Sequence, residues 1–490
     1  MRSAPALCPA CSSAATRPGS GANGVHARDP TRTAAIADAG AEPCVWLQQR
    51  LDGRLRCCGG TCPKRQRCTV RCCQPLTSAT VPVATACPDC GTLLSFPPLP
   101  RRSIAVCLRC HNQIETTIAR NVDAALTCAV ATLALLPLVC TQPLLRAELL
   151  GQHSESSLIA GVAQLWQQDW TVLAALSVVF VILLPAVRMT LLALALGTLR
   201  LGFRPPWLGH VFRWAVWLDR WAMLDVFLLS VAVGYYYLTS IEHLTVVIES
   251  GGLLLLAAGV LTMLSRATLS QRTVWRAIGG EPPAVPHDAA IGCRTCGLIQ
   301  SPMREGARCL RCGARIRARK PDAATVAAAL LSAAFILLFP ANLSPMNSSD
   351  LLGIHLQYTN FGYVRQLWHL GLWPLSMITF WTSILNPAVM MICLGWCVLS
   401  VWRHSSRRLV LKTKLQRTIV EAGRWTEAGP LTIVFFVPLI DFGHLGAEAA
   451  GGGATAFIVM SLLLMAASVT FDPRLMWDAP PRTGIADHPA

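Results

Sequence analysis

The sequence predicts an α-helical polytopic membrane protein, built as two tandem four-helix transmembrane bundles in a parallel repeat, each preceded by a small cysteine-rich module. Three observations predict this fold class. The 490 residues are 53% hydrophobic and only 14% charged, with a mean hydropathy of +0.47, whereas soluble domains carry about 25% charged residues. The chain also holds eight long apolar segments and an internal repeat. These values are not those of an ordinary soluble enzyme.

The eight apolar segments are candidate membrane spans, since a helix needs about 20 apolar residues to cross a bilayer. The fourth reaches that length only when residues 244–249 and 251–252 are added. Very short links join the third span to the fourth and the seventh to the eighth, which predicts antiparallel helical hairpins. The segments are residues 124–145, 171–199, 221–240, 253–264, 323–343, 373–402, 431–445 and 454–470.

Basic residues predict the orientation of these spans. The net charge of +16 comes from 42 Lys and Arg against 26 Asp and Glu. The positive charges gather after spans two, four and six, while the alternate loops carry mainly acidic residues. Because positive loops stay on the cytoplasmic side, both termini and the central linker are expected in the cytoplasm. A surface for nucleic acid is the rival explanation of the charge, and we do not expect a nucleic-acid partner.

An internal repeat with an offset of about 202 to 206 residues covers the chain from Cys87 to its end. Cys87-x-x-Cys90 recurs as Cys293-x-x-Cys296, and Arg272-x-x-Trp275 recurs as Arg474-x-x-Trp477. Gln-Leu-Trp and Pro-Ala-Val also recur in the same order. Since each half has an even number of spans, both halves face the same way, and the repeat is parallel rather than inverted.

Each half begins with two Cys-x-x-Cys knuckles, and two such knuckles place four thiolates around one tetrahedral zinc ion. Such a closed site is structural, because it leaves no position for a reacting water. We therefore predict two cytoplasmic zinc ribbons, with two zinc ions per chain. Iron fits the same spacing. The expected ligands are Cys87, Cys90, Cys107 and Cys110 in the first ribbon and Cys293, Cys296, Cys309 and Cys312 in the second.

The segment before the first ribbon is rich in Pro, Gly, Ala and Arg, and its cysteines follow no ribbon spacing. We expect it to be disordered, or to result from a misplaced start of translation near Val81 or Val83. The predicted domains are this extension (1–84), the first zinc ribbon (85–118), the first bundle (119–270), a linker (271–290), the second zinc ribbon (291–318), the second bundle (319–472) and a cytoplasmic tail (473–490).

Polar residues inside the spans are expensive and usually have a partner or a function. Arg188 in span two and Asp225 in span three are predicted to pair and to lock the first bundle. The second half offers neutral polar residues instead. These either bond to neighbouring helices or form a polar groove for a lipid headgroup. They are Asn342, Thr382, Ser383 and Asn386.

These motifs together resemble the paraquat-inducible protein A family, which includes the inner-membrane A subunit of the lipophilic envelope-spanning tunnel system. Besides the paired ribbons, the resemblance rests on Pro340-Ala-Asn-Leu-Ser-Pro345, Arg220-Trp-Ala-Met-Leu-Asp225 and Phe471-Asp-Pro-Arg-Leu-Met-Trp477-Asp478. It implies a bacterial inner-membrane protein that works with a periplasmic MCE-domain protein and passes phospholipid to or from its tunnel, supporting envelope integrity.

Two other functions stay open. A non-transporting scaffold or stress-response protein would use its ribbons to recruit cytoplasmic partners. A membrane thiol oxidoreductase would cycle Cys87 and Cys90 to a disulfide, although the sequence around them lacks the βαβ context of thioredoxin-like motifs. No phosphate-binding loop and no triad of nucleophile, base and acid stand out in the sequence. We therefore expect a protein that is not an enzyme.

Overall fold

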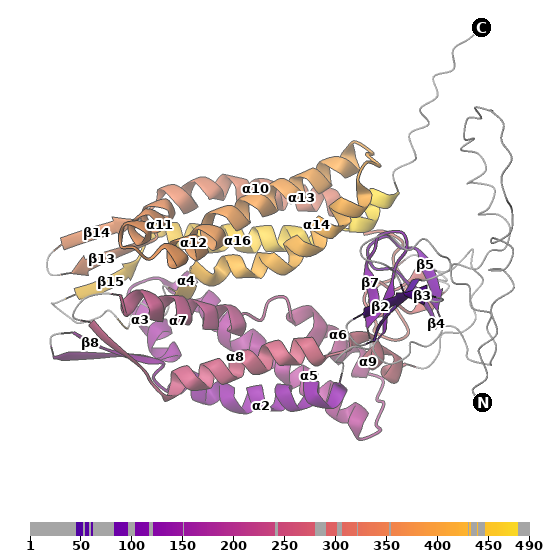
Figure 1. Ribbon diagram of the computed structural model, residues 1–490, viewed down its shortest axis with the longest axis horizontal. Helices are drawn as coiled ribbons and strands as arrows, with labels where there is room; N and C mark the ends of the chain where they lie inside the picture. Colours follow the sequence, from indigo (N-terminus) through magenta and orange to yellow (C-terminus); the bar gives the residue numbers. More distant parts are fainter. Residues whose placement is uncertain are drawn as a thin grey trace, which may run out of the picture. The chain divides into compact units, whose positions relative to one another are not determined.

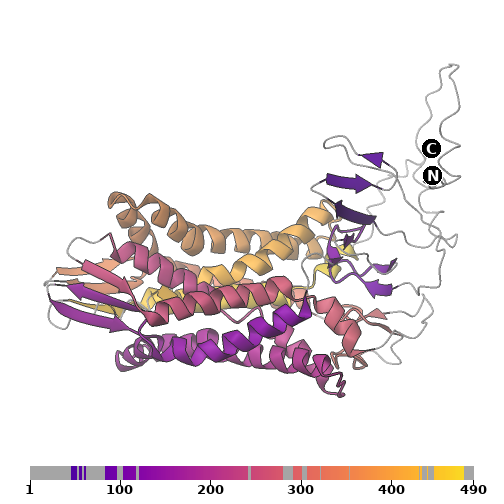
Figure 2. The ribbon, with the colours of Figure 1, turned by 60° about the horizontal axis from the view of Figure 1, so that its bottom comes forward.

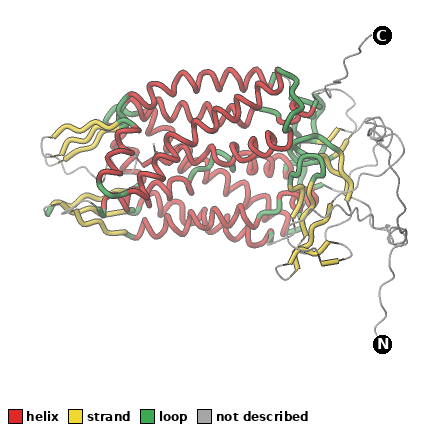
Figure 3. Tube along the Cα trace, turned by 45° about the horizontal axis from the view of Figure 1, so that its top comes forward, coloured by secondary structure: helices red, strands yellow, loops and turns green. Residues whose placement is uncertain are grey.

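Two helical bundles lie side by side in the computed structural model, with strands at both of their ends (Figure 1, Figure 3). The described part of the chain belongs to one compact unit, Cys44–Ala490. One group of strands belongs to the cysteine-rich modules, and we call that end the ribbon end; the opposite end is the sheet end. The structure describes residues 46–51, 54–57, 60–61, 83–96, 103–116, 121–149, 151–240, 244–279, 291–300, 306–320, 322–351, 354–429, 431–432, 439 and 446–478.

The first bundle contains two helices that pack along their whole length, α2 and α8, and a long composite helix made of α4, a π-helical stretch and α5 (Figure 2). Asn121 caps α2 by accepting a hydrogen bond from the Asp123 N–H. The elements are α2 (Val122–Thr141), α3 (Leu158–Gln167), α4 (Thr171–Ser177), η2 (Val178–Leu183), α5 (Leu184–Arg200), α6 (Leu208–Leu218), α7 (Leu224–Leu238), α8 (Ser250–Thr268) and α9 (Gln271–Ile278).

The second bundle repeats this order, with α10 packed along α16 and a composite helix of α12, a π-helical stretch and α13. The π-helical stretch again directly precedes an X-Pro pair, here Asn386-Pro387. The elements are α10 (Ala323–Leu343), α11 (Asn360–His369), α12 (Trp373–Phe380), η4 (Trp381–Leu385), α13 (Asn386–Trp402), α14 (Leu409–Ala422), η5 (Gly423–Glu427), α16 (Gly452–Thr470) and η7 (Pro473–Trp477).

Six helices among the described residues are long and apolar enough to cross a membrane: α2, α4–α5, α8, α10, α12–α13 and α16. The predicted third span appears as α7, which has 15 residues. The predicted seventh span, 431–445, lies mostly outside the described residues. The fourth span was wrong at its start, because Leu244–Ile248 forms strand β10 and the helix gains its length by continuing to Thr268.

Small antiparallel sheets at the sheet end were not predicted. The first has the order β10-β8-β9 and the second has the order β14-β13-β15. Each sheet contains a hairpin that follows the first long helix of its bundle, and each receives a third strand from just before the last long helix. The strands are β8 (Leu145–Leu149), β9 (Gln152–Ser156), β10 (Leu244–Ile248), β13 (Asn347–Leu351), β14 (Ile354–Tyr358) and β15 (Gly446–Ala450).

Glycines allow the last long helix of each bundle to begin against the loop that precedes the hairpin. A Cβ on Gly251 would lie 2.5 Å from the Pro143 carbonyl oxygen, and a Cβ on Gly453 would lie 2.6 Å from the Ser344 carbonyl oxygen. No side chain fits at such distances, so the repeat keeps glycine at both places.

The ribbons consist of short hairpins: β4 (Val83–Ala86) with β5 (Leu93–Phe96), β6 (Ser103–Val106) with β7 (Gln113–Thr116), and β11 (Ile291–Gly292) with β12 (Ile299–Gln300). Three strands also occur in the segment that we expected to be disordered: β1 (Trp46–Leu51), β2 (Arg54–Cys57) and β3 (Gly60–Thr61). They extend the β6–β7 hairpin in the order β3-β2-β1-β6-β7. Most of the predicted extension lies outside the described residues.

Candidate metal centres and the charge cluster between the bundles

The four cysteines of the first ribbon form one buried cluster, and their sulfur atoms all lie within 4.8 Å of one another. The two knuckles face each other, with 3.4 Å between the Sγ atoms of Cys87 and Cys110 and 3.7 Å between those of Cys90 and Cys107. Each knuckle closes with a backbone bond, from the Gly91 N–H to the Cys87 carbonyl and from the His111 N–H to the Cys107 carbonyl.

The second ribbon repeats this arrangement. Its Sγ atoms are 3.6 Å apart for Cys293 and Cys312 and 3.5 Å apart for Cys296 and Cys309. The residue after each knuckle has a positive φ in both ribbons, 75° at Gly91, 72° at Gly297 and 65° at Gly313, and 56° at His111. Glycine adopts this conformation without strain, which explains why a small residue follows three of the four knuckles.

The sulfur spacing fits a tetrahedral metal ion. Zinc binds thiolates at about 2.3 Å, so two sulfurs of a tetrahedral site lie about 3.8 Å apart. The sulfur–sulfur separations of 3.4 to 3.7 Å approach that value and far exceed the bond of about 2.05 Å in a disulfide. The eight ribbon cysteines are all free thiols. Each cluster can therefore hold one metal ion, with no ligand position left for water.

The predicted polar residues of the second bundle do not form one group. The Asn342 side chain donates to the Leu338 carbonyl at 2.9 Å and lies near Asn360, at the sheet end of α10. Thr382 donates to the Ile378 carbonyl of the preceding helical turn at 3.0 Å. Asn386 donates to the Ala422 carbonyl at the end of α14 at 3.1 Å, and Ser383 lies beside Gly429, just after η5. Asn342 is thus separate from the other three.

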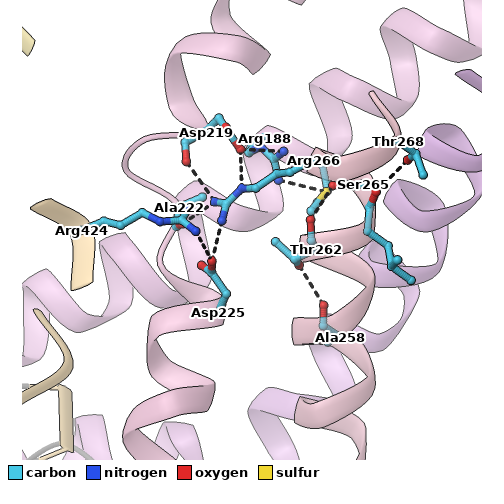
Figure 4. A network of polar contacts seen from close by, with 12 residues as sticks. Arg188, Asp219, Ala222, Asp225, Ala258, Thr262, Ser265, Arg266, Thr268 and Arg424 are labelled. Carbon is cyan, nitrogen blue, oxygen red and sulfur yellow. Dashed lines mark hydrogen bonds and ion pairs between the residues drawn. The ribbon is translucent and has the colours of Figure 1, made fainter. Parts of the chain in front are cut away.

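A cluster of buried charges joins the two bundles near their ribbon ends (Figure 4). Arg188 contacts Asp219 at 2.7 Å, and Arg266 contacts both Asp219 at 2.7 Å and Asp225 at 2.6 Å. Arg424 from the second bundle also contacts Asp225 at 2.6 Å. Asp225 is fully buried, and the exposed fraction of the Arg188 side chain is 2%. Three guanidinium groups therefore share two carboxylates.

The predicted direct pair of Arg188 with Asp225 needs correction, because Arg188 contacts Asp219 and Arg266 stands between the two carboxylates. The other two arginines of the cluster, Arg266 and Arg424, were not predicted as partners of these carboxylates. Arg266 lies in the last turn of α8, one helix away from its acidic partners. Burial raises the pKa of Asp219, but Arg188 and Arg266 outweigh burial and hold the pKa below its usual value.

Glu427 is another buried acidic residue that the sequence did not single out. It ends η5, its exposed fraction is 4%, and it accepts a hydrogen bond from the Ser461 hydroxyl of α16. In the first bundle, the Ser230 hydroxyl donates to the Ala428 carbonyl at 2.8 Å. The segment from Arg424 to Ala428 thus provides polar contacts to both bundles.

Several known proteins are similar in sequence to most of this chain. The intermembrane transport protein PqiA of Escherichia coli K12 is 27% identical over 407 residues, which cover 81% of this chain and 96% of that protein. The lipophilic envelope-spanning tunnel protein A of the same organism is 27% identical over 80% of this chain and 91% of its own length. A probable intermembrane transport protein of Haemophilus influenzae is 23% identical over 80% of this chain. No solved structure matches.

The profile described as paraquat-inducible protein A matches residues 122–279 and 325–480. These two matches cover most of the two bundles and fall on the two halves of the internal repeat. The chain belongs to the paraquat-inducible protein A family.

Proposed function

We propose that this protein is the inner-membrane component of an MCE-type intermembrane lipid transport system, which passes phospholipid to or from a periplasmic MCE-domain protein and so supports envelope integrity. The observation that carries the proposal is similarity over nearly the whole length of relatives named for intermembrane transport and for an envelope-spanning tunnel. Six long apolar helices suit a component embedded in a membrane. A transport component of this kind is not an enzyme.

In this proposal the chain crosses the bacterial inner membrane eight times, and both termini and both ribbons lie in the cytoplasm. Segment 431–445 and α7 supply the two spans beyond the six long helices. The support is the excess of Lys and Arg around the ribbons and in the loops that follow α5 and α13. The small sheets then lie on the periplasmic side, where an MCE-domain partner would be.

The two ribbons bind two zinc ions in this proposal, with the four cysteines of each ribbon as ligands. Iron at the same thiolates is the alternative. The support is the burial of all eight cysteines and the fit of the sulfur spacing. Because four thiolates leave no open position, the metal holds the ribbon together and takes no part in chemistry.

The lipid contacts the neutral polar residues of the second bundle. Thr382, Ser383 and Asn386 lie at the junction of η4 and α13, where the helix is widened, and Asn342 lies nearer the sheet end. Polar groups at these two levels would suit a headgroup that moves along the bundle. The support is their position inside a membrane helix, where polar groups are rare without a role.

Photocrosslinking tests this function. A photoreactive residue placed next to Asn386 or next to Asn342 in the full chain should capture copurifying phospholipid in cells. An equal probe at Ile392, whose exposed fraction is 72%, shows the background from bulk membrane. The same cells should yield a complex with a single-span MCE-domain protein. Absence of lipid above the Ile392 background at every interior position would contradict transport.

A non-transporting scaffold is the second candidate, and the position of both ribbons together at one end of the molecule favours it (Figure 1). A scaffold predicts that ribbon variants lose cytoplasmic partners while phospholipid crosslinking stays at background. The transport proposal predicts the opposite for the interior probes. The crosslinking experiment therefore separates the two candidates.

A further inference from the structure

The repeated Arg-x-x-Trp motif lies at the ribbon end of each bundle, and the proposed function gives it no role. In the first bundle it is part of α9, as Arg272 and Trp275; in the second it is part of η7, as Arg474 and Trp477. Arg474, Trp275 and the cap of η7 at Asp472 are buried. A buried arginine at the end of a helical bundle must have partners, and these partners are the ribbons.

The second bundle binds the first ribbon. Arg474 donates from Nε to the Pro88 carbonyl at 3.0 Å and from Nη2 to the Cys87 carbonyl at 3.4 Å. The Arg109 guanidinium lies 5.0 Å from the centre of the Trp477 ring. These contacts join residues that are separated by more than 360 positions in the sequence.

Arg417 of α14 supports the same ribbon from the other side. It donates to the Asp89 carboxylate at 2.6 Å and to the Cys110 carbonyl at 3.0 Å. Together with Arg474 it thus holds the backbone of both knuckles of the first ribbon. Trp477 connects these contacts to the bundle, since its Nε1–H donates to the Thr413 hydroxyl at 3.1 Å.

The first bundle binds the second ribbon. Its four cysteines belong to the same buried cluster as Phe212 of α6 and Trp275 of α9. Arg311, inside the second knuckle, donates to the Gly279 carbonyl at the end of α9 at 3.1 Å. A Cβ on Gly209 of α6 would lie 1.9 Å from the Arg311 carbonyl oxygen, so the helix and the knuckle are in direct backbone contact.

We propose that the two ribbons are docked crosswise, and that the metal in the first ribbon holds the ribbon end of the second bundle while the metal in the second ribbon holds that of the first. This inference rests on the metal-binding part of the proposed function. It reverses the expectation from chain order, in which the first ribbon belongs to the first bundle. The Arg-x-x-Trp motif is the ribbon-binding motif, and the metal state of each ribbon regulates the bundle that it contacts.

The link to the metal follows from which groups the arginines contact. Cys87, Pro88 and Cys110 present backbone carbonyls of the knuckles, not side chains. We expect those carbonyls to keep this arrangement in solution only while both knuckles bind one ion, because four thiolates without a metal repel one another or become protonated and lose their common centre. Loss of the metal therefore removes the acceptors of Arg417 and Arg474.

Each ribbon also contacts the bundle that follows it in the chain, so the crossed pattern must be measured rather than assumed from one variant. Arg272 donates to the Thr85 hydroxyl of the first ribbon at 2.7 Å, and Arg276 pairs with Glu115 of the same ribbon. The exposed fraction of Arg276 is 39%, and a partly exposed pair is weak. In the second ribbon, Arg294 donates to the Phe471 carbonyl at 3.4 Å and lies 3.7 Å from the Asp472 carboxylate, before η7. In the Cys107→Ser chain we expect the first set of contacts to spread some loosening to α9, but less than the loosening of α14 and η7.

Hydrogen exchange of the full chain in lipid nanodiscs, read together with metal content, tests the proposal. Cys107→Ser should lower the metal content by about one ion per chain and speed amide exchange in α14 and η7 at least about tenfold, with a smaller change in α6. The matched variant Cys309→Ser should give the reverse, with faster exchange in α6 and α9. Faster exchange in α6 and α9 for Cys107→Ser, with α14 and η7 unchanged, would overturn crossed docking.

A second variant leaves all metal ligands in place. Arg474→Gln should keep both metals but speed the release of one of them to a chelator about tenfold, because the knuckle loses two donors to its backbone. Arg407→Gln, at an exposed arginine before α14, is the control. Unchanged release kinetics in Arg474→Gln would contradict the proposal. A wild-type chain without bound metal would refute both the metal centres and the crossed docking. If the wild type binds two metals but each cysteine variant speeds amide exchange in the bundle that follows its ribbon in the chain, crossed docking alone is refuted.

Discussion

Replacing Asp225 by leucine should destabilise this protein far more than replacing Arg424 by methionine, although the two residues form one ion pair. Asp225 is fully buried and accepts from both Arg266 and Arg424 at 2.6 Å. Removing one partner of a buried pair costs about 3–5 kcal/mol, because the remaining charge stays buried without compensation. Asp225→Leu leaves three guanidinium groups around the single carboxylate of Asp219, so we expect a loss in that range.

The expected effect of Arg424→Met is smaller. Asp225 keeps Arg266, and the cluster then has two guanidinium groups for two carboxylates. The loss is one hydrogen bond to a charged group, about 1.5–3 kcal/mol, offset in part by relief of the positive excess. Because the double variant removes one charge of each sign, it should be more stable than Asp225→Leu alone.

Unfolding by SDS in mixed micelles, followed by tryptophan fluorescence, measures these differences. Arg200→Met is the matched control, since Arg200 pairs with Asp123 at an exposed position and should leave the midpoint unchanged. The reasoning fails if Asp225→Leu unfolds at the wild-type midpoint, or if the double variant loses the full sum of the two single losses.

Three further predictions follow from the same structure. Cys87→Ser should lower the metal content by about one ion per chain, while a thiol oxidoreductase would keep its metal content and instead lose a Cys87–Cys90 disulfide in mass analysis. The pKa of Asp219 is lowered in the folded protein. The Asp219 carboxylate therefore stabilises the fold above its unfolded pKa of about 3.9, and this stabilisation is lost as pH falls through the lower folded pKa. The wild type should lose stability at acid pH, and Asp219→Asn should lose stability less steeply over the same pH range. Gly453→Ala should cost about 1–3 kcal/mol through overpacking, because its Cβ would meet the Ser344 carbonyl, whereas Gly452→Ala meets nothing within 4 Å and should be neutral in the same unfolding assay.

Features fixed by nearby residues were predictable from the sequence, and features fixed by distant partners were not. The knuckle spacing alone placed Cys87 and Cys90 in a four-thiol cluster, and long apolar runs placed the six long helices. The strands at the sheet end were missed because each has five residues, and β10 was read as the start of a membrane helix because its residues are apolar. The predicted partner of Arg188 was wrong for a different reason. Asp219 and Asp225 are only six residues apart in the sequence, and Arg266 from another helix lies between their carboxylates and leaves Asp219 as the partner of Arg188. The docking of the ribbons could not be read from chain order at all.

Pro185 shows how a repeated sequence motif can have a purely structural meaning at the interface of helices. In the π-helical stretch the Leu184 N–H bonds to the Val179 carbonyl, five residues back. The next donor in that pattern would be residue 185 bonding to Phe180, but proline has no N–H. The Phe180 carbonyl is therefore free, and it accepts from the Met223 N–H at 3.1 Å, at the start of α7. Because of the proline, a backbone carbonyl in the middle of a membrane helix bonds to the start of α7 instead of to its own helix. The donor, Met223, lies two residues before Asp225. Since the second bundle repeats the widened turn before Pro387, with the Asn386 N–H bonded to the Trp381 carbonyl, the repeated Pro-Ala-Val motif fixes the shape of the long helices beside the charge cluster. That role accounts for its presence in both halves, including the half where Met390 stands at the position of Arg188.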